Sequence, residues 1–178
     1  DPIIFYNFFG KNVPFASKDN LLGQLPSLKK NFLSYKDYSN FKDIEGLTGK
    51  PESAILEIKT INELRSMVFL NNGKELIGSP LPKSAQMSSI EDIYIGEEQG
   101  KPVLVFVGNY LDNVTELGPN DANSGGILSS FDKKEFRSFV PINIPKHLNA
   151  RRIVRLDNGS YLVLANNDNA YIFNPSNN

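Results

Sequence analysis

Hydrophobic and polar positions follow two different periods along this chain of 178 residues. Between residues 18 and 39, leucine and aromatic side chains recur at spacings of three and four positions, which is typical of a helix. Pro26 interrupts this stretch and cannot donate a helical hydrogen bond, so the pattern predicts two short helical pieces. Residues 3–16 are rich in aromatic side chains around Gly10 and predict a β-hairpin, whereas residues 40–52 carry two glycines and predict a loop.

From residue 54 onward the pattern is that of β-strands, with short apolar runs separated by polar turns. Two of these turns, 71–73 and 157–159, contain the Asn-Gly pair that favours tight hairpins. The expected strands are residues 54–59, 64–70, 74–77, 90–96, 102–108, 126–131, 135–140, 151–156, 160–165 and 169–174. The sequence therefore predicts an N-terminal region of hairpin and helices, residues 1–53, and a strand-rich region, residues 54–178.

The strand-rich region contains an internal repeat. Residues 93–109 (IYIGEEQGKPVLVFVGN) align with residues 153–167 (IVRLDNGSYLVLANN), and residues 67–82 (MVFLNNGKELIGSPLP) are an earlier segment of the same kind. A spacing of roughly 45–60 residues is typical of stacked repeats such as β-propeller blades, whose sheets bury both faces by stacking on their neighbours. We therefore expect residues 90–108 and 152–165 each to form two adjacent antiparallel strands, at equivalent places in successive sheets.

A wider set of segments supports this reading. These segments are residues 81–95 (LPKSAQMSSIEDIYI), 103–110 (VLVFVGNY), Glu116, 118–122 (GPNDA), Gly125-Gly126, and the upstream stretch 14–41. Together they resemble the C-terminal part of FG-GAP/VCBS-repeat proteins, which are large bacterial envelope proteins built on a β-propeller, often with an ASPIC/UnbV-type module. The resemblance implies a mainly β fold, namely a partial β-propeller of about two blades of antiparallel strands with a short N-terminal helical insertion. It also implies a location in the cell envelope or outside the cell.

The chain differs from this family in the turns that would bind calcium. Related repeats often carry a D-x-D-x-D-G-type loop between the first two strands of a blade, because Ca²⁺ takes about six to eight oxygen ligands. The equivalent turns here, 96–100 (GEEQG) and 156–159 (LDNG), lack alternating carboxylates. We therefore expect no high-affinity Ca²⁺ site within residues 93–101 or 153–160, no other metal and no cofactor.

Composition narrows the function classes further. Nineteen basic and twenty acidic residues give a net charge of −1, without the clustered basic face that nucleic-acid binding requires. The absence of cysteine excludes disulfides, thiolate zinc sites and cysteine nucleophiles. No apolar run approaches the roughly 20 residues of a membrane span. Residues 1–6 have the composition of a strand and no signal-peptide pattern, so we expect a fragment or a processed product.

Candidate catalytic groups are few. Asp112, Glu116 and Asp121 lie in the loop after residues 102–108, and glycosidases use two carboxyl groups about 5–10 Å apart. Loop spacing fixes no distance, however, and Asp is common in loops because it bonds its own backbone. His147 is the single histidine, and the sequence contains neither a G-x-S-x-G motif nor a second histidine that could act with it. We therefore expect a surface histidine and no catalytic residue.

Recognition is the role this loop suits best. The residues expected to contact a ligand, with Tyr110 as a stacking platform, are Asn109, Tyr110, Glu116, Asp121 and Asn123. Asparagine also serves in turns, so a structural role for these amides stays open. The favoured function is a non-catalytic segment of an envelope-associated binding or scaffold protein, whose partner is a glycan or another envelope protein. The alternatives are a carbohydrate-active enzyme module using loop carboxylates and a purely architectural C-terminal cap.

The strand edges add one expectation about association. About two blades cannot close a ring, and unpaired strand edges invite pairing with other chains. We therefore expect edge-mediated self-association, or an edge covered by the helical segment of residues 18–39.

Overall fold

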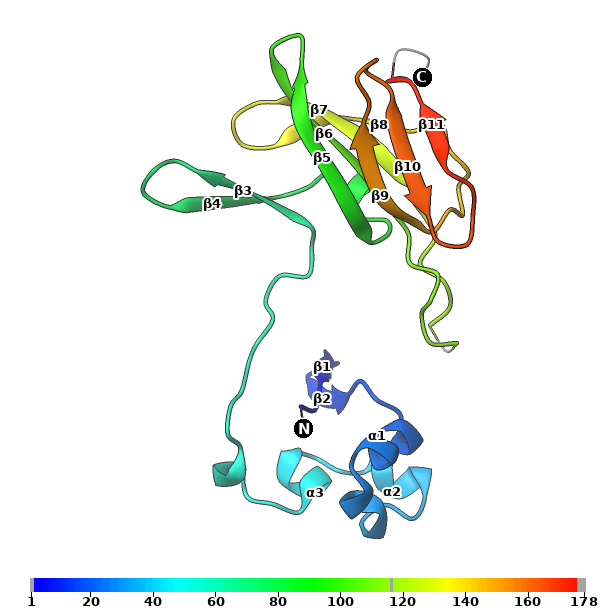
Figure 1. Cartoon of the computed structure of the whole chain (residues 1–178). Helices are drawn as coiled ribbons and strands as arrows, with labels where there is room; N and C mark the ends of the chain where they lie inside the picture. Colours follow the sequence, from blue (N-terminus) through cyan, green and yellow to red (C-terminus); the bar gives the residue numbers. More distant parts are fainter. Residues whose placement is uncertain (1, 116, 176–178) are drawn as a thin grey trace. The chain divides into compact units, whose positions relative to one another are not determined.

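The computed structural model describes residues 2–115 and 117–175, which fall into two compact units, Asp1–Ile61 and Asn62–Asn178 (Figure 1). The fold is mainly β, as predicted, and consists of several small antiparallel sheets. Within the described ranges, no helix is long and apolar enough to cross a membrane.

The first unit begins with the predicted hairpin, made of β1 (Phe5–Phe8) and β2 (Lys11–Pro14). The helical elements that follow are α1 (Lys18–Gln24), η1 (Pro26–Lys30), α2 (Tyr35–Ser39), α3 (Ile44–Thr48) and η2 (Glu52–Ala54). The predicted break at Pro26 is confirmed, because α1 ends at Gln24 and the proline opens the 3₁₀ turn η1. Leu21, Leu28 and Leu47 lie in the small core of this unit.

Two predictions for this part of the chain are wrong. Residues 40–52 are not simply a loop, because Asp43 caps the start of α3 through its Oδ1, 2.8 Å from the N–H of Gly46, and Gly49 ends the helix at φ 67°. The strand expected over residues 54–59 is absent, and residues 55–66 form no helix or strand. Leu56 in this segment is fully exposed, because the segment has no neighbouring strand or sheet to bury its apolar side chains.

The second unit begins with a hairpin and continues with two larger sheets. β3 (Met67–Asn71) pairs with β4 (Leu76–Pro80), and the short turn η3 (Lys83–Ala85) follows. A four-stranded antiparallel sheet then has the order β5 (Ile90–Glu98), β6 (Lys101–Gly108), β7 (Gly125–Phe131) and β8 (Phe136–Pro141). The last sheet has the order β9 (Ala150–Arg155), β10 (Tyr161–Ala165) and β11 (Tyr171–Phe173). The predicted pairings of β5 with β6 and of β9 with β10 are confirmed.

The second strand of the four-stranded sheet, β6, is buried on both faces. Val105 and Val107 of β6 belong to a core shared with β9, β10 and β11, whereas Leu104 and Phe106 point into a second core with Leu81. Alternate side chains of a strand point to opposite faces, so a continuous apolar run is typical of a strand buried on both sides. The run at residues 103–107 therefore follows from the position of β6 between two layers.

The first strands of the two larger sheets lie beside each other and run in the same direction. Arg151 of β9 binds Glu91 of β5, and the N–H of Ile153 donates to the carboxylate of Asp92 at 2.9 Å. Further along both strands, Arg155 donates to the hydroxyl of Tyr94 at 3.0 Å. Residue numbers rise together on both strands, so they are parallel neighbours from adjacent sheets (Figure 1). Each sheet thus adds its second and third strands in the same order from an equivalent first strand.

Candidate functional site

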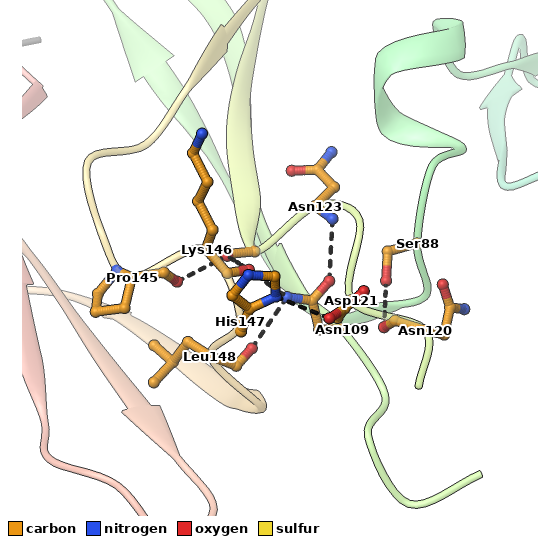
Figure 2. A network of polar contacts seen from close by, with 10 residues as sticks. Ser88, Asn109, Asn120, Asp121, Asn123, Pro145, Lys146, His147 and Leu148 are labelled. Carbon is orange, nitrogen blue, oxygen red and sulfur yellow. Dashed lines mark hydrogen bonds and ion pairs between the residues drawn. The ribbon is translucent and has the colours of Figure 1, made fainter. Parts of the chain in front are cut away.

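The loop after β6 is fixed at its base by Asn109. This residue is fully buried, and its backbone has φ 75°, a left-handed conformation that asparagine tolerates better than most residues. Its Nδ2 donates to the carbonyls of Lys146 (2.9 Å) and Leu148 (3.2 Å), and its Oδ1 accepts the N–H of Asn123 (3.1 Å). Figure 2 shows these bonds joining both ends of the loop to the segment before β9. The amide therefore has a structural role and no free group for a ligand.

Asn123 and Ser124 secure the other end of the loop. Asn123 donates from Nδ2 to the carbonyl of Ser84 at 2.6 Å and accepts the N–H of Gly125 on Oδ1 at 3.0 Å. The hydroxyl of Ser124 contacts the carbonyls of Pro145 and Lys146. Asn123 is thus occupied by internal hydrogen bonds in the same way as Asn109.

A pair of backbone hydrogen bonds between Tyr110 and Asn120 closes the loop next to its anchored base. The N–H groups of Tyr110 and Asn120 each donate to the carbonyl of the other residue at 2.8 Å, and the hydroxyl of Ser88 also donates to the carbonyl of Asn120. Tyr110 and Asn120 thus form an isolated antiparallel bridge. This bridge fixes the two points between which the outer part of the loop begins and ends.

Arg151 contacts charged and aromatic side chains beside the Tyr110–Asn120 bridge. Its Nη1 donates to Oε2 of Glu91 at 2.6 Å, and its Nη2 lies 3.3 Å from Oδ2 of Asp112. The guanidinium also lies over the ring of Tyr110, 5.1 Å from the ring centre, which is a cation–π arrangement. The Tyr110 side chain is held between the loop and β9 and is still 37% exposed.

Asp121 of this loop pairs with His147 of the segment before β9. The Nδ1 atom of His147 is 2.7 Å from Oδ2 of Asp121, and the two side chains are 78% and 34% exposed. The prediction of a surface histidine is confirmed by this exposure. The pairing with Asp121 was not foreseen, because the two residues are 26 positions apart in the sequence.

The five residues expected to contact a ligand therefore divide into three groups. Asn109 and Asn123 hold the loop, whereas Tyr110 and Asp121 present side chains at the surface around it. Glu116 lies outside the described residues. The side chains of Arg151, Glu91 and His147 also belong to this cluster and were missed from the sequence. The available signal was the pair of opposite charges on two repeat-related strands, at Glu91-Asp92 and Arg151-Arg152.

A separate polar hollow lies at the far end of β6, where the turns of the two larger sheets meet. It has a volume of about 560 Å³ and is lined mainly by Glu97, Glu98, Gln99, Arg155, Asn158 and Gly159. No group of three or more His, Cys, Asp or Glu residues that could hold a metal occurs in the part of the chain that the structure describes. The expectation about Ca²⁺ in these turns stays a prediction.

Comparisons with protein-family models, with curated proteins and with solved structures found no match. The resemblance to FG-GAP/VCBS-repeat proteins therefore stays a prediction.

Proposed function

We propose that this chain is a non-catalytic segment of an envelope-associated protein of the β-propeller type, and that it acts in binding or as a scaffold. The loop of residues 109–124 is its recognition element, and the partner is a glycan or another envelope protein. The envelope location rests on the family resemblance alone.

The propeller part of this proposal is supported by the stacking of the sheets. Blades of a propeller place equivalent strands around one axis and pack face to face. The parallel contact between β5 and β9 and the shared strand order are the relationships expected between two adjacent blades. The burial of both faces of β6, within the four-stranded sheet, is a further property expected of an inner blade.

The anchoring of the loop by Asn109 is the observation that supports recognition. Binding loops work best when a rigid scaffold presents them, because little conformational entropy is then lost on association. Three internal hydrogen bonds from one buried amide hold the base, and Tyr110 offers a rigid, partly exposed ring above it. Tyrosine supplies contact area at a low cost in side-chain entropy.

The alternative of a glycosidase has less support from the same cluster. Glu91 and Asp112 both contact Arg151, and Asp121 contacts His147, so each of these carboxylates already has a partner side chain within the protein. A glycosidase pair instead has to face the scissile bond, one group donating a proton and the other acting as nucleophile or base. Because the carboxylates are engaged by Arg151 and His147, the cluster favours polar recognition over hydrolysis.

A binding screen with loop variants tests the proposal. The full chain is screened against bacterial cell-wall polysaccharides and peptidoglycan fragments, and hits are titrated with Tyr110→Ala and Asp121→Ala. We expect each variant to weaken binding at least about tenfold, equivalent to about 1.4 kcal/mol. Asp157→Ala is the control, because Asp157 is an exposed carboxylate in the turn between β9 and β10. Binding that survives both loop variants would place recognition elsewhere, and the absence of any hit would favour the architectural cap.

A further inference from the structure

The first hairpin of the chain has the same turn as the first hairpin of the four-stranded sheet. Between β1 and β2, Phe9 and Gly10 have φ 48° and 81°, and between β5 and β6, Gln99 and Gly100 have φ 51° and 73°. Two consecutive residues with positive φ are the signature of a type I′ hairpin turn. Phenylalanine adopts such a conformation rarely, so this turn is not a local preference of Phe9.

The second hairpin, β3–β4, has the same turn as β7–β8. Asn72 and Asp132 each donate their N–H to the carbonyl of the residue three positions later, at 3.3 and 3.2 Å. Each also accepts, on Oδ1, the N–H groups two and three positions later, at 2.9–3.0 Å. The next residue has positive φ in both turns, 86° at Gly73 and 70° at Lys133, and Lys-Glu follows in both.

The two pairs of turns occur in the same order but at different spacings. Gly10 and Asn72 are 62 positions apart, whereas Gly100 and Asp132 are 32 positions apart. The extra length lies between the second and third strands of the set, where β5–β8 has the loop of residues 109–124 and the N-terminal part has residues 17–66.

We propose that residues 3–80 are one copy of the four-stranded unit seen in β5–β8, interrupted between its second and third strands by the helical segment of residues 17–66. The chain then contains three successive copies of the unit, with β9–β11 as the third. The helical segment and the 109–124 loop are insertions at the same connection of two consecutive copies. The hairpin of residues 3–16 then belongs to the repeat series, and it also packs with the helical segment within the first unit.

The exposed side chains of the first hairpin fit this organisation. Tyr6, Phe8 and Phe15 are 46%, 54% and 59% exposed, and ring contacts link Tyr6 to both phenylalanines. Phe5 of this hairpin packs against the helical core, so the exposed aromatic side chains are the part of the two-stranded sheet that nothing covers. In the β5–β8 copy, by contrast, β6 of the equivalent hairpin contributes side chains to a core on each face.

Hydrogen exchange of the full chain tests the proposal, with residues 67–80 as the reporter segment. We expect Phe8→Ser to raise the exchange rate of residues 67–80 at least about tenfold, because a change in one half of a cooperative sheet destabilises the other half. Leu33→Ser is the matched control, since Leu33 is an 85% exposed apolar residue of the helical segment. Unchanged exchange of residues 67–80 in Phe8→Ser, or an equal increase in Leu33→Ser, would overturn the proposal.

A second variant guards against a general folding defect. Residues 17–65 are replaced by a short Gly-Ser linker, so that the two halves of the copy remain in one chain. We expect residues 67–80 to keep their protection from exchange in this variant and to lose it when residues 1–16 are deleted instead. Loss of protection after removal of the helical segment, or its persistence after removal of residues 1–16, would contradict the proposal.

Discussion

Replacing Asn109 with alanine removes the buried amide that holds the base of the recognition loop. The substitution deletes the two hydrogen bonds from Nδ2 to Lys146 and Leu148 and the bond that Oδ1 accepts from Asn123. It also places a residue with a Cβ and no local polar group at φ 75°. The carbonyl of Leu148 and the N–H of Asn123 then lose these bonds, whereas the carbonyl of Lys146 keeps its contact with the Ser124 hydroxyl.

The expected cost can be worked out from these losses. A buried polar group left without its partner costs about 1–3 kcal/mol, and partial relaxation of the loop keeps the sum for the two groups at about 2–4 kcal/mol. The left-handed backbone adds about 1 kcal/mol for alanine, which glycine avoids. We therefore expect Asn109→Ala to lose about 3–5 kcal/mol of unfolding free energy, and Asn109→Gly about 1 kcal/mol less than that.

Urea unfolding of the full chain measures both values, with hydrogen exchange of residues 101–108 and 125–131 assigning the transition to the second unit. Asn12→Ala is the control, because Asn12 is exposed in β2, and its substitution should change stability by less than about 0.5 kcal/mol. If Asn109→Ala is as stable as the control, the buried hydrogen bonds do not hold the loop and the account of its base is wrong.

Three further predictions concern other parts of the second unit. The hydrogen bond that the backbone N–H of Glu135 donates is the largest of the contacts that hold the pKa of the Asp132 carboxyl below its usual range. The carboxylate therefore stabilises the fold above about pH 4, and this contribution is lost as the pH falls further, so Asp132→Asn should show a flatter acid-unfolding curve than the wild type. Tyr161→Phe should change the unfolding free energy by less than about 1 kcal/mol, because the buried Tyr161 hydroxyl has no partner among the described residues; a larger loss would show that the hydroxyl is bonded. Calorimetry should detect no micromolar Ca²⁺ binding, and binding that disappears in Glu97→Ala or Asp157→Ala would contradict this.

Local signals in the sequence were sufficient for most strands. The apolar run at residues 102–108 and the Asn-Gly turn at 157–159 locate β6 and the β9–β10 hairpin within about two residues. Residues 54–59 have a similar composition and form no strand, because a strand also needs a partner, which local composition does not reveal. The helix α3 was missed because five residues that include Gly46 give too little periodicity, although Asp43 and Gly49 carry its capping signals.

The candidate site was harder to predict, because its contacts join distant parts of the chain. The sequence places Asn109 in a polar loop but does not reveal that its side chain is fully buried. The contact between Glu91 and Arg151 spans 60 positions and depends on how the two sheets stack. Tyr110 and Asp121 were selected by residue type, and the structure places them beside Arg151 and His147, which the sequence did not assign to the site.

Binding and cleavage of a glycan, measured on the same samples, distinguish a recognition loop from a catalytic one. The full chain and the single variants Asp112→Ala, Glu116→Ala and Asp121→Ala are incubated with each glycan that the wild type binds, and both bound and released sugar are followed. We expect the wild type to bind without releasing product and Asp121→Ala to bind more weakly. Cleavage by the wild type that falls about a thousandfold in one of these variants, while fold and binding persist, would show that the loop is catalytic.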